Sequence, residues 1–237
     1  MHRFSALIIL YLALLLTGCS AGSPRSQPVQ STTLMSASSD PLVRLSEAVP
    51  EVAVDARYFG SDNFIGRPID GYEADDAMLT GEAAAALQTA ARLASESGYG
   101  ILVYDAYRPQ RAVDHFVRWG RNLADTTMKA RYYPHVPKAE LFDRGYIASR
   151  SGHSRGSTID LTLTRNGSAV DMGTPFDFFD ELSHTENPGI PDSAMAHRLD
   201  LRDIMSEAGF RNYAREWWHY SLIDEPYPDT YFDIPVR

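Results

Sequence analysis

The chain has 237 residues, of which 44% are hydrophobic and 22% charged, a composition typical of a folded globular protein. The formal net charge of −9 disfavours a nucleic-acid-binding surface, so no nucleic acid is expected as a partner. A single cysteine excludes an intramolecular disulfide and a cysteine-rich zinc site, so any metal site has to use histidine and carboxylate ligands.

The N-terminus has the features of an export signal. A basic start precedes the uncharged run Phe4–Leu16, which has the length of a signal-peptide core and is too short to span a bilayer. Leu-Thr-Gly-Cys at residues 16–19 resembles the bacterial lipobox, in which the cysteine is lipidated. We therefore predict a signal peptide at residues 1–18 and a lipid anchor on Cys19. The alternative is an ordinary signal peptide that ends beside a chance cysteine.

The lipidated Cys19 is followed by a segment rich in Ser, Thr, Ala, Gly, Pro and Gln, so residues 19–40 are predicted to form a flexible tether. Ser20 after the cysteine resembles lipoproteins of the outer membrane, so we expect a periplasmic, membrane-anchored protein if the source is Gram-negative. Residues 41–237 contain no internal repeat and are predicted to form one domain.

In chain order, the first clear element is a helix over Thr80–Ser97, which is rich in alanine, starts at a capping threonine and stops at a glycine. The β-branched and aromatic segment Ile101–Tyr107 predicts a strand, and Pro109 then starts a second helix that runs to about Asn122. The expected inward residues of the two helices are Leu87, Ala90, Ala91, Ala94, Ala112, Val113, Phe116 and Trp119 or Gly120.

The segment Thr158–Thr164 alternates strictly between apolar and polar residues and predicts a strand with Asp160 on its polar face. Arg198–Ala208 predicts a helix ended by a glycine, and Trp217–Ile223 a final strand. Because helices and strands mix without a regular βαβ rhythm, we expect a single α+β domain with a mainly antiparallel sheet flanked by helices.

Two histidines and one aspartate form a candidate metal site. His153 lies in a glycine-containing turn just before the strand that carries Asp160, and His219 lies in the last predicted strand. Two imidazoles and a carboxylate suit Zn²⁺ and leave a fourth position open for water, as in catalytic sites. Taken singly, His153 could be a turn histidine and Asp160 a surface carboxylate; His184, in a polar loop, is a reserve ligand.

Glu216 is the candidate general base. In an extended strand its spacing from His219 would place the two side chains on opposite faces, so both can meet one metal only if a turn or bulge lies near Glu216. With such a turn, Glu216 could take a proton from water and pass it to a leaving amine. The alternative is a salt bridge with Arg215 or Arg211.

Arg108 lies between a predicted strand and Pro109, at the N-terminus of a helix. A cation there opposes the helix dipole, which is easier to explain if its guanidinium faces an anion such as a tetrahedral oxyanion. The alternative is a simple pair with Asp105.

With these residues in hand, the chain resembles the zinc D-alanyl-D-alanine dipeptidases of the VanX type, within a group of zinc D,D-peptidases that shares a core with the Hedgehog signalling domain. The resemblance runs from about Ala56 to the C-terminus. It rests on ordered blocks of sequence at residues 56–72, 104–113 (Y-D-A-Y-R-P-Q-R-A-V), 151–163 (S-G-H-S-R-G-S-T-I-D-L-T-L), 172–184, 216–220 (E-W-W-H-Y) and 224–233.

The resemblance implies hydrolysis of D-alanyl-D-alanine with one Zn²⁺ per chain, a role connected with the cell wall, and no protein partner. It implies that the zinc ligands are His153, Asp160 and His219, the base Glu216 and the transition-state residue Arg108. It also suggests that Asp177 receives the substrate ammonium, that Ser151 lines the pocket, and that Tyr58 and Tyr72 contact the dipeptide. The signal, lipobox and tether depart from the best-known members, which are cytoplasmic.

Two other functions stay open at this stage. A zinc D,D-carboxypeptidase acting on peptidoglycan stems would need an open cleft without an ammonium-binding carboxylate, and Asp177 speaks against it. A non-catalytic zinc module that binds cell-wall peptides would be favoured by loss of the base or the arginine, and both are present.

Overall fold

A computed structural model of the protein describes residues 40–237. The predicted signal peptide, Cys19 and all of the predicted tether except Asp40 lie outside the described residues. The strands are β1 (Leu42–Arg44), β2 (Ala53–Val54), β3 (Met78–Thr80), β4 (Gly100–Asp105), β5 (Thr158–Arg165), β6 (Ser168–Ala169), β7 (Phe210–Asn212) and β8 (His219–Leu222). The α-helices are α1 (Leu45–Ala48), α2 (Gly81–Glu96), α3 (Gln110–Arg121), α4 (Lys129–Tyr132) and α5 (Asp192–Glu207), and the 3₁₀ helices are η1 (Lys138–Glu140), η2 (Gly152–Arg155) and η3 (Glu181–Ser183).

The main sheet has the strand order β2-β4-β5-β8-β7, with the short β6 paired to β5. Only the β2–β4 pair is parallel, whereas β4–β5, β5–β6, β5–β8 and β7–β8 are antiparallel. A separate antiparallel pair joins β1 to β3. The predicted α+β class with a mainly antiparallel sheet is therefore confirmed. Among residues 40–237, none of the helices combines the length and apolar character that crossing a bilayer requires.

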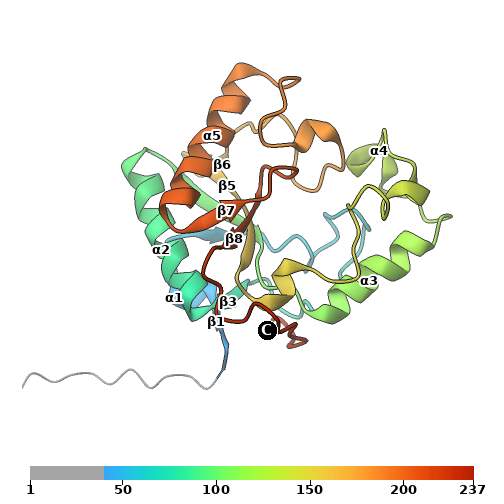
Figure 1. Ribbon diagram of the computed structural model, residues 1–237, viewed down its shortest axis with the longest axis horizontal. Coiled ribbons are helices and arrows are strands. Elements are labelled where there is room, and N and C mark those ends of the chain that lie inside the picture. The colour runs from blue at the N-terminus through green and yellow to red at the C-terminus, as the bar shows by residue number, and fades with distance from the viewer. Residues whose placement is uncertain (1–39) are drawn as a thin grey trace, which may run out of the picture. The chain divides into compact units, whose positions relative to one another are not determined.

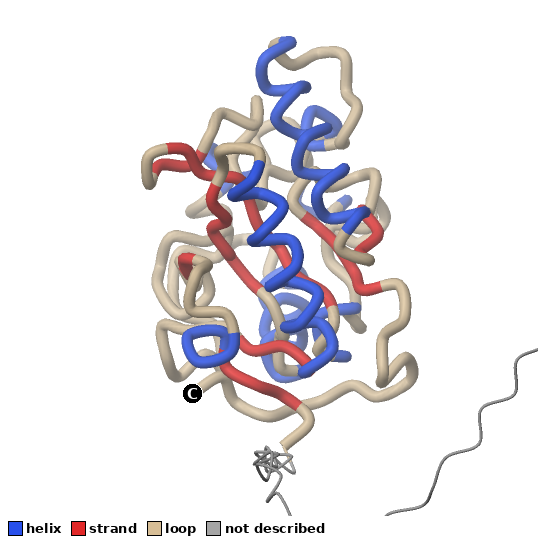
Figure 2. The backbone as a smooth tube through the Cα atoms, turned by 90° about the vertical axis from the view of Figure 1, so that its left-hand side faces the viewer, coloured by secondary structure: helices blue, strands red, loops and turns tan. Residues whose placement is uncertain are grey.

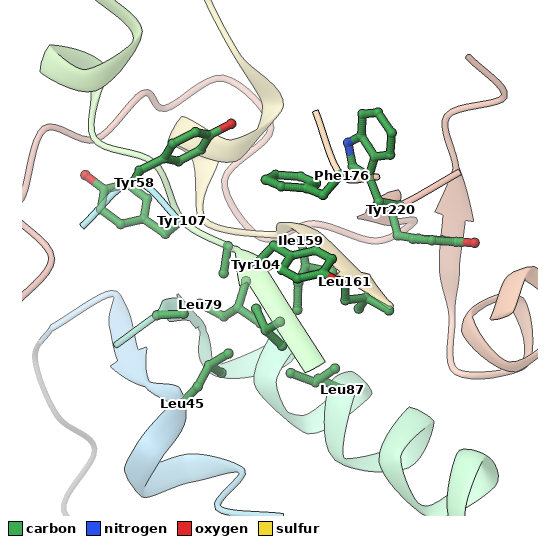
Figure 3. Packing of buried hydrophobic residues seen from close by; sticks show 14 of the residues in the cluster. Leu45, Tyr58, Leu79, Leu87, Tyr104, Tyr107, Ile159, Leu161, Phe176 and Tyr220 are labelled. Carbon is green, nitrogen blue, oxygen red and sulfur yellow. The ribbon is translucent and has the colours of Figure 1, made fainter. Parts of the chain in front are cut away.

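Helices α2 and α5 lie side by side over one face of this sheet (Figures 1 and 2). The apolar residues of β5, Ile159, Leu161 and Leu163, are fully buried and alternate with polar residues that point to the other face. In the close view, Leu45 and Leu87 lie toward the helices, Tyr58 and Phe176 lie at the opposite edge, and Ile159 and Leu161 lie between them (Figure 3). The helix-covered face is thus packed with apolar side chains, and the polar residues of β5 lie on the opposite face.

A bulge in β4 puts an extra carboxylate on that opposite face. Val103 pairs with Leu161, but the register shifts before the next pair, so that Asp105 and not Tyr104 stands opposite Asp160. Without the bulge, strict alternation would place Asp105 opposite Ile159, on the helix-covered face.

Helices α2 and α3 confirm the sequence-based expectations closely. The Thr80 hydroxyl accepts the backbone N–H of Ala83 as the N-cap of α2, and Pro109 immediately precedes α3. The predicted inner stripe of each helix is buried.

Three predicted boundaries were wrong. Strand β4 ends at Asp105 and not at Tyr107, because the N–H of Tyr107 donates to Met78 and so leaves the sheet. Helix α5 begins at Asp192, six residues before Arg198. Its first turn, Asp-Ser-Ala-Met, buries only the small Ala194, which is a weaker sequence signal than the Leu201, Ile204 and Met205 that follow. Strand β8 begins at His219 and not at Trp217, whose N–H donates to the carbonyl of Ser183.

Candidate active site

The three predicted metal ligands meet on the open face of the sheet. Asp160 of β5 pairs directly with His219 of β8, and His153 lies on η2, just before β5. His153 Nε2 lies 3.3 Å from Asp160 Oδ2, and His219 Nδ1 lies 3.0 Å from Asp160 Oδ1. One potential ligand atom from each residue lies within 4.8 Å of the other two. The structure therefore brings together all three residues that the sequence pattern selected, and His184 lies outside this cluster.

The arrangement of the donor atoms is better explained by coordination of a metal ion than by hydrogen bonds among the three side chains. His153 Nε2 and His219 Nδ1 approach to 3.2 Å. Asp160 Oδ1 is buried and makes no hydrogen bond within residues 40–237, although His219 Nδ1 is close. His153 Nδ1 lies 2.6 Å from the carbonyl oxygen of Ala106, which fixes the proton on Nδ1 and leaves the Nε2 lone pair free. Two imidazole nitrogens and one carboxylate oxygen are a donor set suited to Zn²⁺.

Burial and mutual charge set the protonation of these groups. Burial lowers the pKa of His153. Burial would also lower the pKa of His219, but the close approach and negative charge of Asp160 outweigh it and raise that pKa. Burial would raise the pKa of Asp160, but the two imidazoles hold it well below the usual range. Asp160 is therefore the negative centre of the cluster.

The turn that Glu216 needs is present. The His219 N–H donates to the Glu216 carbonyl at 3.2 Å, so the chain turns before β8 and both side chains reach one side. Glu216 Oε2 lies 3.5 Å from His219 Nδ1, and burial raises the pKa of Glu216. The alternative is not seen, because no ion pair joins Glu216 to Arg215 or Arg211 in the described part of the chain. Arg215 donates instead to the carbonyl of Arg144.

Arg108 is held by one carboxylate and reaches toward a second. Its guanidinium lies 2.9 Å from Asp105 Oδ2 and 3.5 Å from Asp160 Oδ2, so the pair with Asp105 exists and the side chain also faces the metal cluster. Burial would lower the pKa of Arg108, but Asp105 and its other neighbours raise it well above the ordinary value. Arg108 is therefore a fixed, permanent cation.

Asp105 is a site residue that the sequence analysis considered only as a partner of Arg108. It is 2% exposed, accepts a 2.6 Å hydrogen bond from the Tyr72 hydroxyl, and lies 3.5 Å from His153 Nδ1. Burial raises the pKa of Asp105 despite the charge of Arg108. Asp105 could have been recognised in the sequence from its position three residues before Arg108, at the end of a predicted strand.

The four proposed substrate-contacting residues differ in their placement. Asp177 is buried and accepts a 2.9 Å hydrogen bond from the Tyr58 hydroxyl, and both residues line the cavity. Ser151 also lines it, and its hydroxyl accepts the N–H of His153. Tyr72 does not line the cavity, because its hydroxyl is directed to Asp105, so the expectation of a direct Tyr72 contact with the dipeptide is not supported.

Asp177 has an unusual environment for a carboxylate. It is 6% exposed, its backbone adopts a left-handed φ of +60°, and no cation pairs with it among residues 40–237. Burial, followed by the charge of Asp160, raises the pKa of Asp177 well above its usual range. A buried carboxylate without a cation suits a positively charged ligand.

These groups surround one cavity of about 280 Å³. Both polar groups and aromatic rings line it. The aromatic residues that line the cavity are Tyr58, Phe64, Phe116, Tyr146, Phe179, Tyr213 and Trp218. A small cavity with a few convergent charged groups is typical of an enzyme acting on a small molecule.

The η2 turn that carries His153 is followed by Gly156, which packs against residues near the N-terminus of the domain. Gly156, which ends η2 with φ +83°, accepts the Thr80 N–H at 2.7 Å, and a Cβ there would lie 2.6 Å from Leu42 Cδ2. Only glycine fits both this backbone conformation and this close approach.

Known proteins resemble this chain over most of its length. A family model described as "D-ala-D-ala dipeptidase" matches residues 38–237. The chain is 50% identical over 194 residues to a D-alanyl-D-alanine dipeptidase of Enterococcus faecalis. The aligned region covers 81% of this chain and 96% of that protein. It is 48% identical over 194 residues, with the same coverage, to one of Streptomyces coelicolor. Among solved structures, the vancomycin resistance D,D-pentapeptidase VanY with Zn(II) aligns over 72% of this chain and 83% of its own, at 16% identity and a TM-score of 0.40.

Proposed function

The chain belongs to the D-Ala-D-Ala dipeptidase family, and we propose on that basis that it hydrolyses D-alanyl-D-alanine to two molecules of D-alanine as a zinc-dependent dipeptidase. The observation that carries the proposal is the meeting of His153, Asp160 and His219 within reach of one ion, in a cavity that Glu216 and Arg108 also line.

Peptidases of this family depend on zinc, and the donor atoms described above fit that ion. We expect one Zn²⁺ per chain, held by His153, Asp160 and His219. When bound, zinc supplies Lewis-acid chemistry that lowers the pKa of water and polarises the peptide carbonyl. The Ala106 carbonyl and the Asp105 carboxylate lie near His153 Nδ1 and so orient the ring with Nε2 toward the metal site.

Glu216 moves the proton in this reaction. Its carboxylate accepts a proton from the attacking water and donates it to the nitrogen of the departing D-alanine, whose bond to the carbonyl carbon breaks. A general base works best when its pKa lies near the working pH, and burial moves the pKa of Glu216 in that direction.

Arg108 stabilises the oxygen of the peptide carbonyl as negative charge develops on it. Its guanidinium is already held by Asp105, so little reorganisation is needed during the reaction. Asp177 binds the free ammonium of the substrate, and the Tyr58 hydroxyl orients that carboxylate. The incoming cation would favour ionised Asp177, and the pair would be shielded from water.

We also propose that the protein is an exported lipoprotein, anchored in a membrane through Cys19 and, in a Gram-negative source, facing the periplasm from the outer membrane. The support is the sequence pattern alone: an uncharged core before a lipobox-like motif, and a polar segment after it. An anchored dipeptidase would act on dipeptides outside the cytoplasm.

The experiment that tests the proposed activity is the release of D-alanine from D-Ala-D-Ala by the purified chain. We expect activity that a chelator removes and that zinc restores. The N-acetylated dipeptide serves as the second substrate, because it lacks the ammonium that Asp177 would bind. Neutralising one partner of a buried charge pair costs about 2 to 5 kcal/mol, so the blocked dipeptide should react at least tens of times more slowly. Equal kcat/KM for the two substrates would point instead to a D,D-carboxypeptidase.

A further inference from the structure

Arg198, on helix α5, is fully buried, and its side-chain hydrogen bonds within the described residues go to one loop. Its Nε donates to the carbonyl of Met172 at 2.7 Å, and its Nη1 donates to the carbonyls of Leu182 at 2.9 Å and His184 at 2.7 Å. Its Nη2 donates to the Thr174 hydroxyl at 3.2 Å. One side chain thus joins the beginning and the end of the loop formed by residues 172–184.

The charge of Arg198 has no carboxylate partner within the described residues. Buried arginines are normally paired with an acid, because taking an unpaired charge out of water is costly. Burial lowers the pKa of Arg198 to about 10, so the guanidinium is still protonated at neutral pH. Its fixed fork of donors satisfies carbonyls that a buried loop would otherwise leave without partners.

The loop carries Asp177 at its middle. Asp177 has a left-handed backbone that non-glycine residues seldom adopt, and such a conformation persists only where the surrounding structure enforces it. Apart from the single turn of η3, the loop has no helix or strand to provide that enforcement. Hydrogen bonds provide it instead: beside Asp177, the Phe179 N–H donates to the Tyr132 carbonyl and the Ser183 hydroxyl to the Phe178 carbonyl. Arg198 adds the bonds that join the two ends of the loop.

Thr174 connects the same loop to the turn that carries Glu216. Its hydroxyl oxygen accepts hydrogen bonds from Arg198 and, at 2.9 Å, from the Trp217 indole N–H. The Trp217 backbone N–H donates to the Ser183 carbonyl at 3.0 Å. Removing the hydroxyl of Thr174 would weaken the attachment of the loop without removing a buried charge.

We propose that Arg198 is a positioning residue that holds Asp177 in place for the substrate ammonium, and so determines the preference for dipeptides with a free amino terminus. The inference rests on the proposed role of Asp177. Because the ammonium stays bound throughout the reaction, losing its site weakens ground state and transition state together and raises KM more than it lowers kcat.

The test compares Arg198→Met and Arg198→Lys with a control, Arg202→Met. Arg202 lies one helical turn further along α5 and pairs with Glu186 and Asp203 at the surface. For Arg198→Met we expect KM for D-Ala-D-Ala to rise roughly 10- to 100-fold, with bound zinc unchanged. This range is the one known for groups that orient metal ligands, applied here to a group that orients a binding carboxylate. Arg198→Lys should recover part of this loss, and Arg202→Met should resemble the wild type. The ratio of kcat/KM for free and N-acetylated dipeptide should fall in the Arg198 variants.

Thr174→Val serves if the Arg198 variants do not fold, since it keeps the side-chain shape and replaces the hydroxyl, with its bonds to Arg198, Trp217 and Ser183, by a methyl group. We expect KM to rise and the ratio of kcat/KM for free and N-acetylated dipeptide to fall, both by less than in Arg198→Met. Thr174→Ser should give values near those of the wild type. Combining Thr174→Val with Asp177→Asn should raise KM no further than Asp177→Asn alone, because both changes act through one carboxylate.

Additive effects of Thr174→Val and Asp177→Asn, or a loss confined to kcat or to bound zinc, would overturn the role of Arg198 while leaving the ammonium site intact. An Asp177→Asn enzyme with wild-type KM and wild-type free-to-blocked ratio would refute the ammonium site itself. The single Asp177 variant therefore separates the two failures.

Discussion

Asp105 and Asp160 stand opposite each other on neighbouring strands, two buried carboxylates on one face of the sheet. The bulge in β4 creates this pairing, and Arg108 reaches both side chains. Like charges so close in a buried site raise each other's pKa unless a cation lies between them. Arg108 therefore has two connected tasks, to keep the carboxylates compatible and to present its guanidinium to the cavity.

Arg108→Ala should lower kcat far more than it raises KM. A donor directed at developing charge acts mainly in the transition state, and removing one such donor typically costs about 10² to 10³-fold. Arg108→Lys should recover only part of the rate, because a point charge cannot reproduce the planar fork. Steady-state kinetics with Arg111→Ala as the control would check this, since Arg111 pairs with Asp233 at the surface. A change in KM alone would assign Arg108 to ground-state binding.

Substitutions at Glu216 and His153 should differ in whether they remove bound zinc together with activity. Glu216→Ala should keep bound zinc and lose rate by roughly 10² to 10⁴-fold, the usual worth of general acid–base catalysis. His153→Ala should lose both, because only two ligands would remain. Metal content measured beside kcat in each purified variant is the check. Near-normal turnover by Glu216→Ala would rule out its role as the base.

Asp177→Asn should stabilise the substrate-free protein at neutral pH. Burial raises the pKa of Asp177 in the folded state, so between the unfolded and folded pKa values the folded protein binds more protons than the unfolded chain. The free energy of unfolding contributed by this group is therefore highest below the unfolded pKa and falls as pH rises through the folded pKa. Urea unfolding of both proteins should show an advantage for Asp177→Asn at pH 7 that shrinks toward about pH 4. An advantage that stays constant with pH would exclude titration of Asp177 as its cause.

Cys19→Ser should release the protein from membranes. Acyl chains contribute about 0.8 kcal/mol per buried CH₂, and stable anchoring takes more than one chain. The wild type should enter the detergent phase of a detergent extraction and Cys19→Ser the aqueous phase. If both enter the aqueous phase, the lipobox interpretation fails.

Much of the site could be predicted because its chemistry is encoded locally. His153 and Asp160 lie seven residues apart, in a glycine turn and on an alternating strand, and the structure keeps both features. The turn at Glu216 followed from a spacing argument: a base and a ligand three residues apart cannot share a face of one strand.

The remaining features depend on contacts between distant segments. Nothing in the local pattern of β4 marks the bulge that moves Asp105 to the active face, because register is decided by the partner strand. Arg198 appeared only as the first residue of a predicted helix, since one sequence cannot tell a buried arginine from a surface one. Its bonds to the Asp177 loop exist only when α5 packs against it.

The contact of Leu42 with Gly156 decides how the protein can be shortened. Strand β1 lies just beyond the predicted tether, and it packs directly beneath the loop that presents His153. A version cut after Arg44 to avoid the lipid anchor would lose this packing, and the neighbouring bond from Thr80 to Gly156 would be left at an open edge. Recombinant protein for kinetics should therefore begin no later than Asp40. In a shorter form the loop that carries His153 would be less firmly held, although every residue that lines the cavity would still be present.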